Sequence, residues 1–203
     1  KTETIKADTT VNGSKATASV KKDDVDKAVK AVGSSNAEIV IDAVSGRSGV
    51  TKSEVTVPAE SVKAAAKDTN ASLVIKTDAG DIKIANKDLS AVTGGSGSDI
   101  TFTVEKNADG SVKVSVKSGG KEITTEKSVI RVSFKADDTL MKSLADKAGA
   151  DNSNLVAAIV KANKTTEIIR NSFVNKDGTV TADIAPGATV TFIANGRSFS
   201  DVA

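Results

Sequence analysis

The sequence lacks most of the side chains that carry enzymatic and metal chemistry. Its 203 residues include no Cys, His, Trp or Tyr, and only 5 Phe, 2 Pro and 1 Met. Without His or Cys, the chain cannot build a serine-type or cysteine-type triad, nor a zinc or haem site of the common kinds. Without Trp or Tyr, it lacks the aromatic platforms on which sugar rings commonly stack. We therefore expect no catalytic, cofactor-binding or metal-binding residue, and no cofactor.

An excess of one charge is also missing. The 28 basic and 26 acidic side chains leave a net charge of +2. They alternate along the chain, as in Lys21–Asp24 and Lys135–Asp138, so that no basic stripe forms. Nucleic-acid binding needs a basic face with aromatic or arginine stacking groups, and few of either are present. We therefore expect no nucleic-acid partner.

Long apolar runs are absent as well. Runs such as Leu155–Val160 fall far short of the roughly 18 to 20 residues that span a bilayer, which predicts no membrane insertion. The chain starts at Lys1 without a charged and then apolar leader, so we expect a mature fragment whose signal peptide was removed or never existed. The lack of Cys, together with much Thr, Ser, Val, Ala, Lys, Asp and Gly, favours an exported bacterial surface protein.

Short segments of alternating apolar and polar residues predict a chain rich in β-strands. Turn pairs at Asp109–Gly110, Ala79–Gly80 and Gly119–Gly120 predict hairpins between them. The predicted strands of the first part are Ala16–Val20, Glu38–Ile41, Glu54–Val57, Ser72–Lys76, Asp81–Ile84, Ile100–Val104, Ser111–Val116 and Val129–Phe134. Those of the last part are Val156–Lys161, Glu167–Val174, Thr179–Ile184 and Thr189–Ala194.

Helical periodicity occurs in fewer places. Between Asp23 and Val32 the apolar residues follow an i, i+3, i+4, i+7 pattern after two carboxylates suited to a helix N-terminus. Pro58–Asp68 has the same plan with proline in the first turn. Two shorter helices are predicted at Lys87–Val92 and Thr139–Ala148. We expect Val25, Val62, Leu73 and Ile75 to belong to the core of this part.

A strand-helix-strand unit recurs after about 35 to 37 residues, at Ala16–Ile41 and again at Glu54–Lys76. Such repetition is typically a packing device in which each unit completes the core of its neighbour. We therefore expect an α+β fold, with strand-helix-strand repeats on a mixed or antiparallel sheet, followed by a small all-β module. The predicted divisions are an α+β module at 1–135, a connecting helix at 136–150, the β module at 151–198, and the start of another repeat at 199–203.

A few acidic patterns could carry chemistry. Asp78, Asp81 and Asp137 would support a carboxylate-dependent hydrolase only if a cleft held two of them close together. Asn107–Gly110 and Asn175–Gly178 resemble part of a calcium loop but lack the later acidic ligand, so we interpret both as hairpin turns. A surface ion site and a lysine-to-asparagine isopeptide cross-link stay open.

The block Val55–Lys67, followed by Leu73–Ile84 and Asn86–Leu89, resembles a known family. It is similar to the non-catalytic module that precedes S-layer homology repeats in surface proteins of Gram-positive bacteria, chiefly clostridial ones. Ala85 stands where that family usually has a second proline, and the terminal part lacks the family's usual aromatic residues. Phe199–Val202 looks like the opening of an S-layer homology repeat.

The resemblance implies a non-enzymatic spacer in the cell wall or S-layer of a Gram-positive bacterium. The implied partners are a cell-wall polymer or the S-layer, reached through adjacent S-layer homology repeats, and the chain is expected to be a monomer. An alternative is an adhesin or carbohydrate-binding module that contacts a glycan, a wall polymer or a host protein. Its contact surface would be formed by the loops Val44–Lys52 and Thr93–Ser98.

Overall fold

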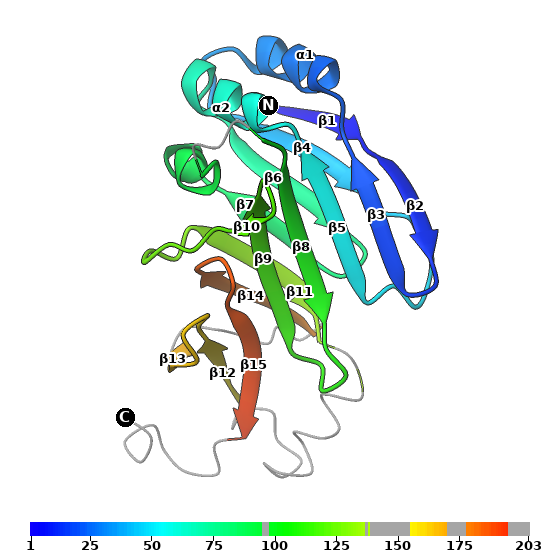
Figure 1. The fold of residues 1–203 in the computed structure, drawn as a ribbon, viewed down its shortest axis with the longest axis vertical. Coiled ribbons are helices and arrows are strands. Elements are labelled where there is room, and N and C mark those ends of the chain that lie inside the picture. Colours follow the sequence, from blue (N-terminus) through cyan, green and yellow to red (C-terminus); the bar gives the residue numbers. More distant parts are fainter. Residues whose placement is uncertain (95–97, 137, 139–154, 170–177, 195–203) are drawn as a thin grey trace.

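The computed structural model describes residues 1–94, 98–136, 138, 155–169 and 178–194. Within these ranges the chain forms two mixed β-sheets and three helices (Figure 1). The six-stranded sheet has the order β1 (Thr2–Lys6), β4 (Glu38–Ala43), β6 (Ser72–Thr77), β7 (Asp81–Ile84), β11 (Ile130–Lys135) and β14 (Thr179–Ile184).

The nine-stranded sheet contains the remaining strands. Its order is β13 (Thr166–Ile169), β12 (Leu155–Val160), β15 (Thr189–Ala194), β9 (Val112–Ser118), β8 (Ile100–Lys106), β5 (Lys52–Val57), β3 (Lys15–Ser19) and β2 (Asp8–Asn12), with β10 (Lys121–Glu122) also paired to β9. Parallel pairing joins β1 to β4, β4 to β6, and β3 to β5. The other pairings in the described residues are antiparallel.

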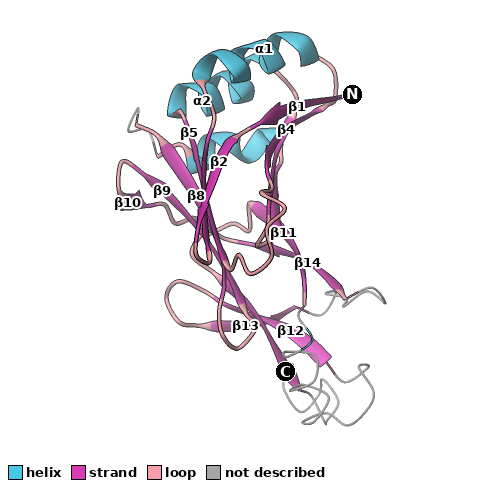
Figure 2. Ribbon diagram, turned by 90° about the vertical axis from the view of Figure 1, so that its right-hand side faces the viewer, coloured by secondary structure: helices cyan, strands magenta, loops and turns pink. Residues whose placement is uncertain are grey.

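The helices connect one sheet to the other. α1 (Lys22–Val32) runs from β3 to β4, and α2 (Ala59–Asp68) runs from β5 to β6. The 3-10 helix η1 (Asn86–Val92) leads from β7 back to β8. Figure 2 shows α1 and α2 together at one end of the two sheets. Each strand-helix-strand unit therefore supplies one strand to each sheet.

Local chemistry explains where α1 begins and ends. Asp23 and Asp24 lie in its first turn, where carboxylates complement the positive end of the helix dipole. The apolar stripe faces the core, and its four members are Val25, Ala28, Val29 and Val32. Gly33 then adopts a positive φ of 56°, and its backbone N–H donates to the Val29 carbonyl. Because only glycine adopts this conformation without steric cost, the helix ends there.

One continuous core fills the space between the sheets. Ile41, Ile75 and Ile82 from the six-stranded sheet and Val55 and Phe102 from the nine-stranded sheet are each 1 % exposed or less. Complete burial of such a side chain contributes about 1.5 to 3 kcal/mol. The same core also contains side chains from the last described strands: Val180, Ala182, Ile184 and Val190.

The α+β class is confirmed, as are the first three predicted helices and the hairpins at Ala79–Gly80, Asp109–Gly110 and Gly119–Gly120. The expectation of a single sheet is wrong, because each unit crosses between two sheets. The strands β1 and β2 were not predicted. They are edge strands, and β1 buries only Ile5, so the apolar alternation that reveals a strand is weak there.

The predicted divisions after residue 135 stay predictions. The connecting helix at 136–150 and the repeat start at 199–203 fall almost wholly outside the described residues, as does the turn Asn175–Gly178. Within the predicted β module, β14 pairs with β11 and β15 pairs with β9. The strands on the two sides of the predicted boundary therefore share both sheets.

Candidate functional site

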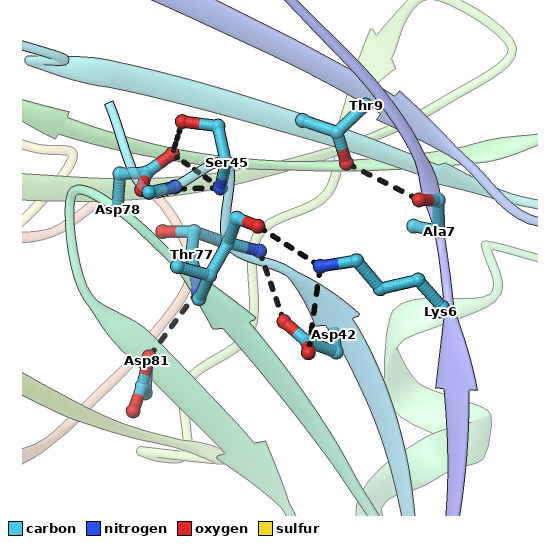
Figure 3. Close-up of polar contacts among 10 residues, drawn as sticks. Lys6, Ala7, Thr9, Asp42, Ser45, Thr77, Asp78 and Asp81 are labelled. Atoms are coloured by element: carbon cyan, nitrogen blue, oxygen red, sulfur yellow. Dashed lines mark hydrogen bonds and ion pairs between the residues drawn. The ribbon is translucent and has the colours of Figure 1, made fainter.

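A network of polar contacts lies at the carboxyl ends of three parallel strands (Figure 3). β1, β4 and β6 run in the same direction and end at Lys6, Ala43 and Thr77. Because α1 and α2 precede β4 and β6, these ends lie at the edge away from the helices. Ligands of open α/β sheets typically bind at such an edge.

Asp78 fixes the loop that follows β4. Its carboxylate accepts hydrogen bonds from the Ser45 backbone N–H at 3.0 Å, the Ser45 hydroxyl at 2.7 Å and the Gly46 N–H at 3.2 Å. The Ser45 hydroxyl oxygen in turn accepts the Arg47 N–H at 3.1 Å. A single carboxylate, directly and through one hydroxyl, therefore satisfies three consecutive backbone donors. This arrangement sets the path of the loop and the position of Arg47.

Lys6 and Asp42 brace the start of the same loop. The Lys6 ammonium lies 3.5 Å from the Asp42 carboxylate and donates to the Val44 carbonyl oxygen at 3.0 Å. Asp42 also accepts the Val44 N–H at 3.1 Å. These contacts are exposed, so each contributes little to stability, but together they hold β1 beside the loop.

A groove of about 490 Å³ runs between this loop and β2. No carboxylate lies among its lining residues, which are Lys6, Ala7, Thr9, Thr10, Val11, Val44, Ser45 and Arg47. Within the described part of the chain, the Arg47 guanidinium has no hydrogen-bond or ion-pair partner. Val44, at 38 % exposure, is the one exposed large hydrophobic residue among those described. The groove thus combines a free cation with an apolar side chain and hydroxyl groups.

Asp81 is the one carboxyl here whose pKa is raised. Burial of the half-buried side chain raises the pKa of Asp81 above its ordinary value, and the nearby Asp42 charge adds to this rise. The Thr77 N–H donates to the Asp81 carboxylate at 3.2 Å and, with Lys76, opposes the rise. A shifted carboxyl of this kind is a common feature of acid–base sites.

The geometry nevertheless gives Asp78 and Asp81 structural roles. Asp78 holds the β4–β5 loop, while Asp81 accepts a backbone donor inside its own hairpin. Neither residue lines the groove beside β2 or three other surface hollows. Asp137, the third carboxylate of the hydrolase hypothesis, lies outside the described residues. None of these four hollows brings the carboxylates of Asp78 and Asp81 together.

Two further hollows lie on the described surface. One, of about 630 Å³, lies over the outward-facing Thr, Ser, Lys and Glu side chains of β5, β8 and β9, where Lys52 is 3.9 Å from Glu54 and 3.7 Å from Glu105. The other, of about 380 Å³, is lined by the buried residues Ile159 and Ala188 and by the Lys161–Glu167 ion pair, at 3.2 Å. Both hollows have carboxylates as well as lysines in their lining, whereas the charged residues that line the groove beside β2 are cations alone.

The stretch that resembles a calcium loop is a hairpin turn, as predicted. The Asp109 carboxylate accepts the Ser111 N–H at 2.9 Å and the Ser111 hydroxyl at 2.6 Å, and these bonds lower the pKa of Asp109. The Asn107 amide donates to the same hydroxyl at 2.9 Å. Across the residues with described positions, no group of three or more Asp or Glu side chains could hold a metal ion.

Of the two loops predicted as a contact surface, Val44–Lys52 is described and borders the groove, whereas residues 95–97 of Thr93–Ser98 are outside the described ranges. Sequence reasoning missed Lys6, Thr9 and Val11, because they belong to strands that were not predicted. The Gly13–Ser14 pair, a hairpin turn between Thr-rich flanks, is a signal that could have revealed β2, but no comparable signal precedes or follows β1.

No helix in the described ranges has both the length and the apolar character needed to cross a bilayer. Comparison of the chain with family models, with curated proteins and with solved structures finds no match. The likeness to modules that precede S-layer homology repeats therefore rests only on the residues quoted above.

Proposed function

We propose that the chain is a non-enzymatic spacer module of a bacterial surface protein. It would hold a fixed distance between the segments that precede and follow it. The main observation in favour of this proposal is where the two ends of the described chain lie. The chain begins beside α1 and α2, and β15 ends toward the opposite end of the long axis of the molecule (Figure 1).

The continuous core supports a mechanical role. Side chains from both sheets, from α1 and α2, and from β14 and β15 belong to one buried cluster. A force applied at one end would therefore act on a single packed unit. Stiffness between the two attachment points is what a spacer requires, and no bound ligand is needed for it.

The sequence features support the finer part of the proposal. In it, the units β3–α1–β4 and β5–α2–β6 are repeats that complete each other's core, and residues 151–198 form a small β module at the far end. S-layer homology repeats after this module would attach the protein to a cell-wall polymer, which places the chain outside the cell as a monomer in the wall or S-layer. Phe199–Val202 is the sequence that suggests such an attachment.

Distance measurement on the whole chain tests the spacer role. Because the chain contains no Cys, Thr2→Cys with Thr191→Cys provides two unique labelling sites near opposite ends. A spacer gives one narrow distance distribution, which stays unchanged when purified cell walls are added. The control pair is Thr2→Cys with Ser34→Cys. Both sites lie at one end of the molecule, because Thr2 pairs with Glu38, four residues after Ser34 in the sequence. A broad distribution for the long pair alone would contradict the proposal.

The adhesin alternative is favoured by one observation, the fixed and exposed Arg47 in the loop Val44–Lys52. A glycan array and sedimentation with wall polymers distinguish the two functions. The spacer is expected to bind neither probe by itself. Saturable binding that Arg47→Gln removes, while Arg131→Gln retains it, would replace the spacer function with an adhesin.

A further inference from the structure

β2 is an open edge of the nine-stranded sheet. It pairs with β3 on one side, from Asp8–Ser19 to Asn12–Lys15, and with no strand on the other side among the described residues. The two-residue turn Gly13–Ser14 closes on the Asn12–Lys15 pair. Since hydrogen-bonded pairs alternate along an antiparallel ladder, Thr9 and Val11 direct their backbone N–H and C=O groups outward. These groups can form hydrogen bonds with one more strand.

This edge is short and begins with one charged residue, Asp8, but it lacks the stronger features that prevent strand addition. Proteins protect free edges with proline, a bulge or a lysine in the strand. The five residues of β2 are Asp-Thr-Thr-Val-Asn and contain none of these. They pair with β3 without a bulge. The edge is therefore short but open to pairing.

The groove beside this edge favours an acidic occupant. Its two cations are Lys6, which Asp42 already neutralises at 3.5 Å, and Arg47, which has no partner among the described residues. Asp78 and the Ser45 hydroxyl hold the loop in place. Because the backbone that carries Arg47 is already ordered, less conformational entropy is lost when a partner binds there.

We propose that β2 accepts an extended acidic segment of a partner protein as an additional strand, with a carboxylate of that segment bound by Arg47. Backbone hydrogen bonds at Thr9 and Val11 supply affinity, and Val44 contacts an apolar side chain of the segment. A peptide fits better than a polysaccharide because it alone matches the donor and acceptor spacing of a strand edge. This lateral contact goes beyond the spacer role and does not depend on it.

The test uses the whole ¹⁵N-labelled chain and three synthetic peptides. The probe is Thr-Val-Glu-Val-Glu-Val-Thr, and the two comparison peptides carry Gln or Lys at both Glu positions. The acidic peptide is expected to shift the amide signals of Thr9, Val11 and Arg47 and to slow hydrogen exchange at Thr9 and Val11. The Gln peptide should bind about five-fold more weakly, and the Lys peptide more weakly still, because a partly exposed charge pair contributes about 1 kcal/mol or less.

Two variants separate the charge from the strand edge. Arg47→Gln should weaken the acidic peptide about five-fold and leave the Gln peptide unchanged. Arg131→Gln is its control, since Arg131 already pairs with Asp183 at 2.9 Å on another strand. Val11→Pro removes an outward donor without breaking the ladder to β3 and should weaken all the peptides. A two-dimensional spectrum of each variant establishes that it remains folded.

Several outcomes would overturn the proposal. Equal binding of the acidic and Lys peptides would exclude charge recognition by Arg47. Tighter binding of polygalacturonate than of the acidic peptide, insensitive to Val11→Pro, would indicate a glycan site. Sedimentation that shows self-association through β2, lost in Val11→Pro, would assign the edge to a second copy of the chain. Failure of the probe to shift any β2 amide at millimolar concentration would exclude the open edge as a peptide site.

Discussion

The first part of the chain, residues 1–94, and the later part, residues 98–194, use similar strands in different ways. In the first part, neighbouring strands belong to consecutive strand-helix-strand units, and parallel pairs such as β3–β5 and β4–β6 dominate. In the later part, β14 pairs with β11 and β15 pairs with β9, each across a long stretch of sequence. Local pattern therefore specifies strands and hairpins in both parts, but it does not specify the pairs that join strands far apart in the sequence.

The largest expected effect comes from breaking the core in the first part. Ile75→Asn places an unpaired amide at a position that is 1 % exposed, so we expect a loss of about 4 kcal/mol in unfolding free energy. Urea titration followed by circular dichroism measures this loss. Val44→Asn, at an exposed position, is the control and should stay within about 0.5 kcal/mol.

Ile75→Asn also tests whether the two parts of the chain fold independently. Because Ile75 and Ile184 belong to one core, we expect β14 and β15 to lose amide protection together with β6. Hydrogen exchange read by NMR reports each strand separately. Protection of β14 and β15 that survives in Ile75→Asn would establish that the later part folds by itself.

The next effect concerns the close packing between the parts. Gly80 has a φ of 156°, and an added Cβ would lie 3.2 Å from the Phe134 Cβ and 3.2 Å from the Ser133 carbonyl oxygen. We expect Gly80→Ala to cost about 2 to 3 kcal/mol, from backbone strain plus the displacement of β11. Gly13 has a φ of 63°, but an added Cβ would lie in open space there. We therefore expect Gly13→Ala to lower the free energy of unfolding by about 1 kcal/mol.

Thermal melts of the two glycine variants provide the measurement. If Gly80→Ala were no more destabilising than Gly13→Ala, the β6–β7 turn would not be packed tightly against β11. The two parts would then be joined less closely than the distances indicate.

A smaller effect is the pH dependence of one carboxyl in each part. Burial raises the pKa of Asp81. The contribution of Asp81 to the free energy of unfolding is therefore present at low pH and is lost as pH rises from 3.8 through its folded-state pKa. Hydrogen bonds from Ser111 lower the pKa of Asp109. The contribution of Asp109 to the free energy of unfolding is therefore present above pH 3.8 and is lost as pH falls through its folded-state pKa.

The measurement is the unfolding free energy of Asp81→Asn and of Asp109→Asn between pH 2 and 6 at constant ionic strength. As pH rises, the difference from the parent should change in opposite directions for the two variants. Relative to the parent, Asp81→Asn should gain stability, and Asp109→Asn should lose it. Parallel profiles for the two variants would contradict the assigned environments.

The smallest effect belongs to the ion pair between β11 and β14. Arg131 lies 2.9 Å from Asp183, but both side chains are more than half exposed. We expect Arg131→Gln to change the unfolding free energy by about 0.5 kcal/mol or less in urea titration. A loss several times larger would mean that this pair, rather than the core, attaches β14 to the rest of the sheet.

Features set by neighbouring residues could be predicted from the sequence. α1 follows from its apolar spacing and from Gly33, and the Asp109 turn follows from an Asp-Gly pair between two strands. The site beside β2 could not be predicted in the same way. Asp78 and Ser45 are separated by 33 positions, and nothing in either local sequence indicates that the carboxylate reaches the other loop.

The number of sheets was beyond sequence reasoning for a related reason. The pattern of β3–α1–β4 is the same whether the second strand joins the sheet of the first or an opposing sheet. The choice depends on which apolar faces meet in the final core, and Ile41 and Val55 reach that core from opposite sides. Such pairing across the core leaves no local trace.

The crossing of each unit between the sheets also determines how such a fold can grow. A further unit inserted beside β5–α2–β6 would widen both sheets by one strand, or about 4.8 Å, while the distance between the sheets stayed constant. The new helix would lie beside α2, at the same end of the two sheets as α1 and α2. An architecture of this kind can vary in width among related proteins without any redesign of its thickness or of its two ends.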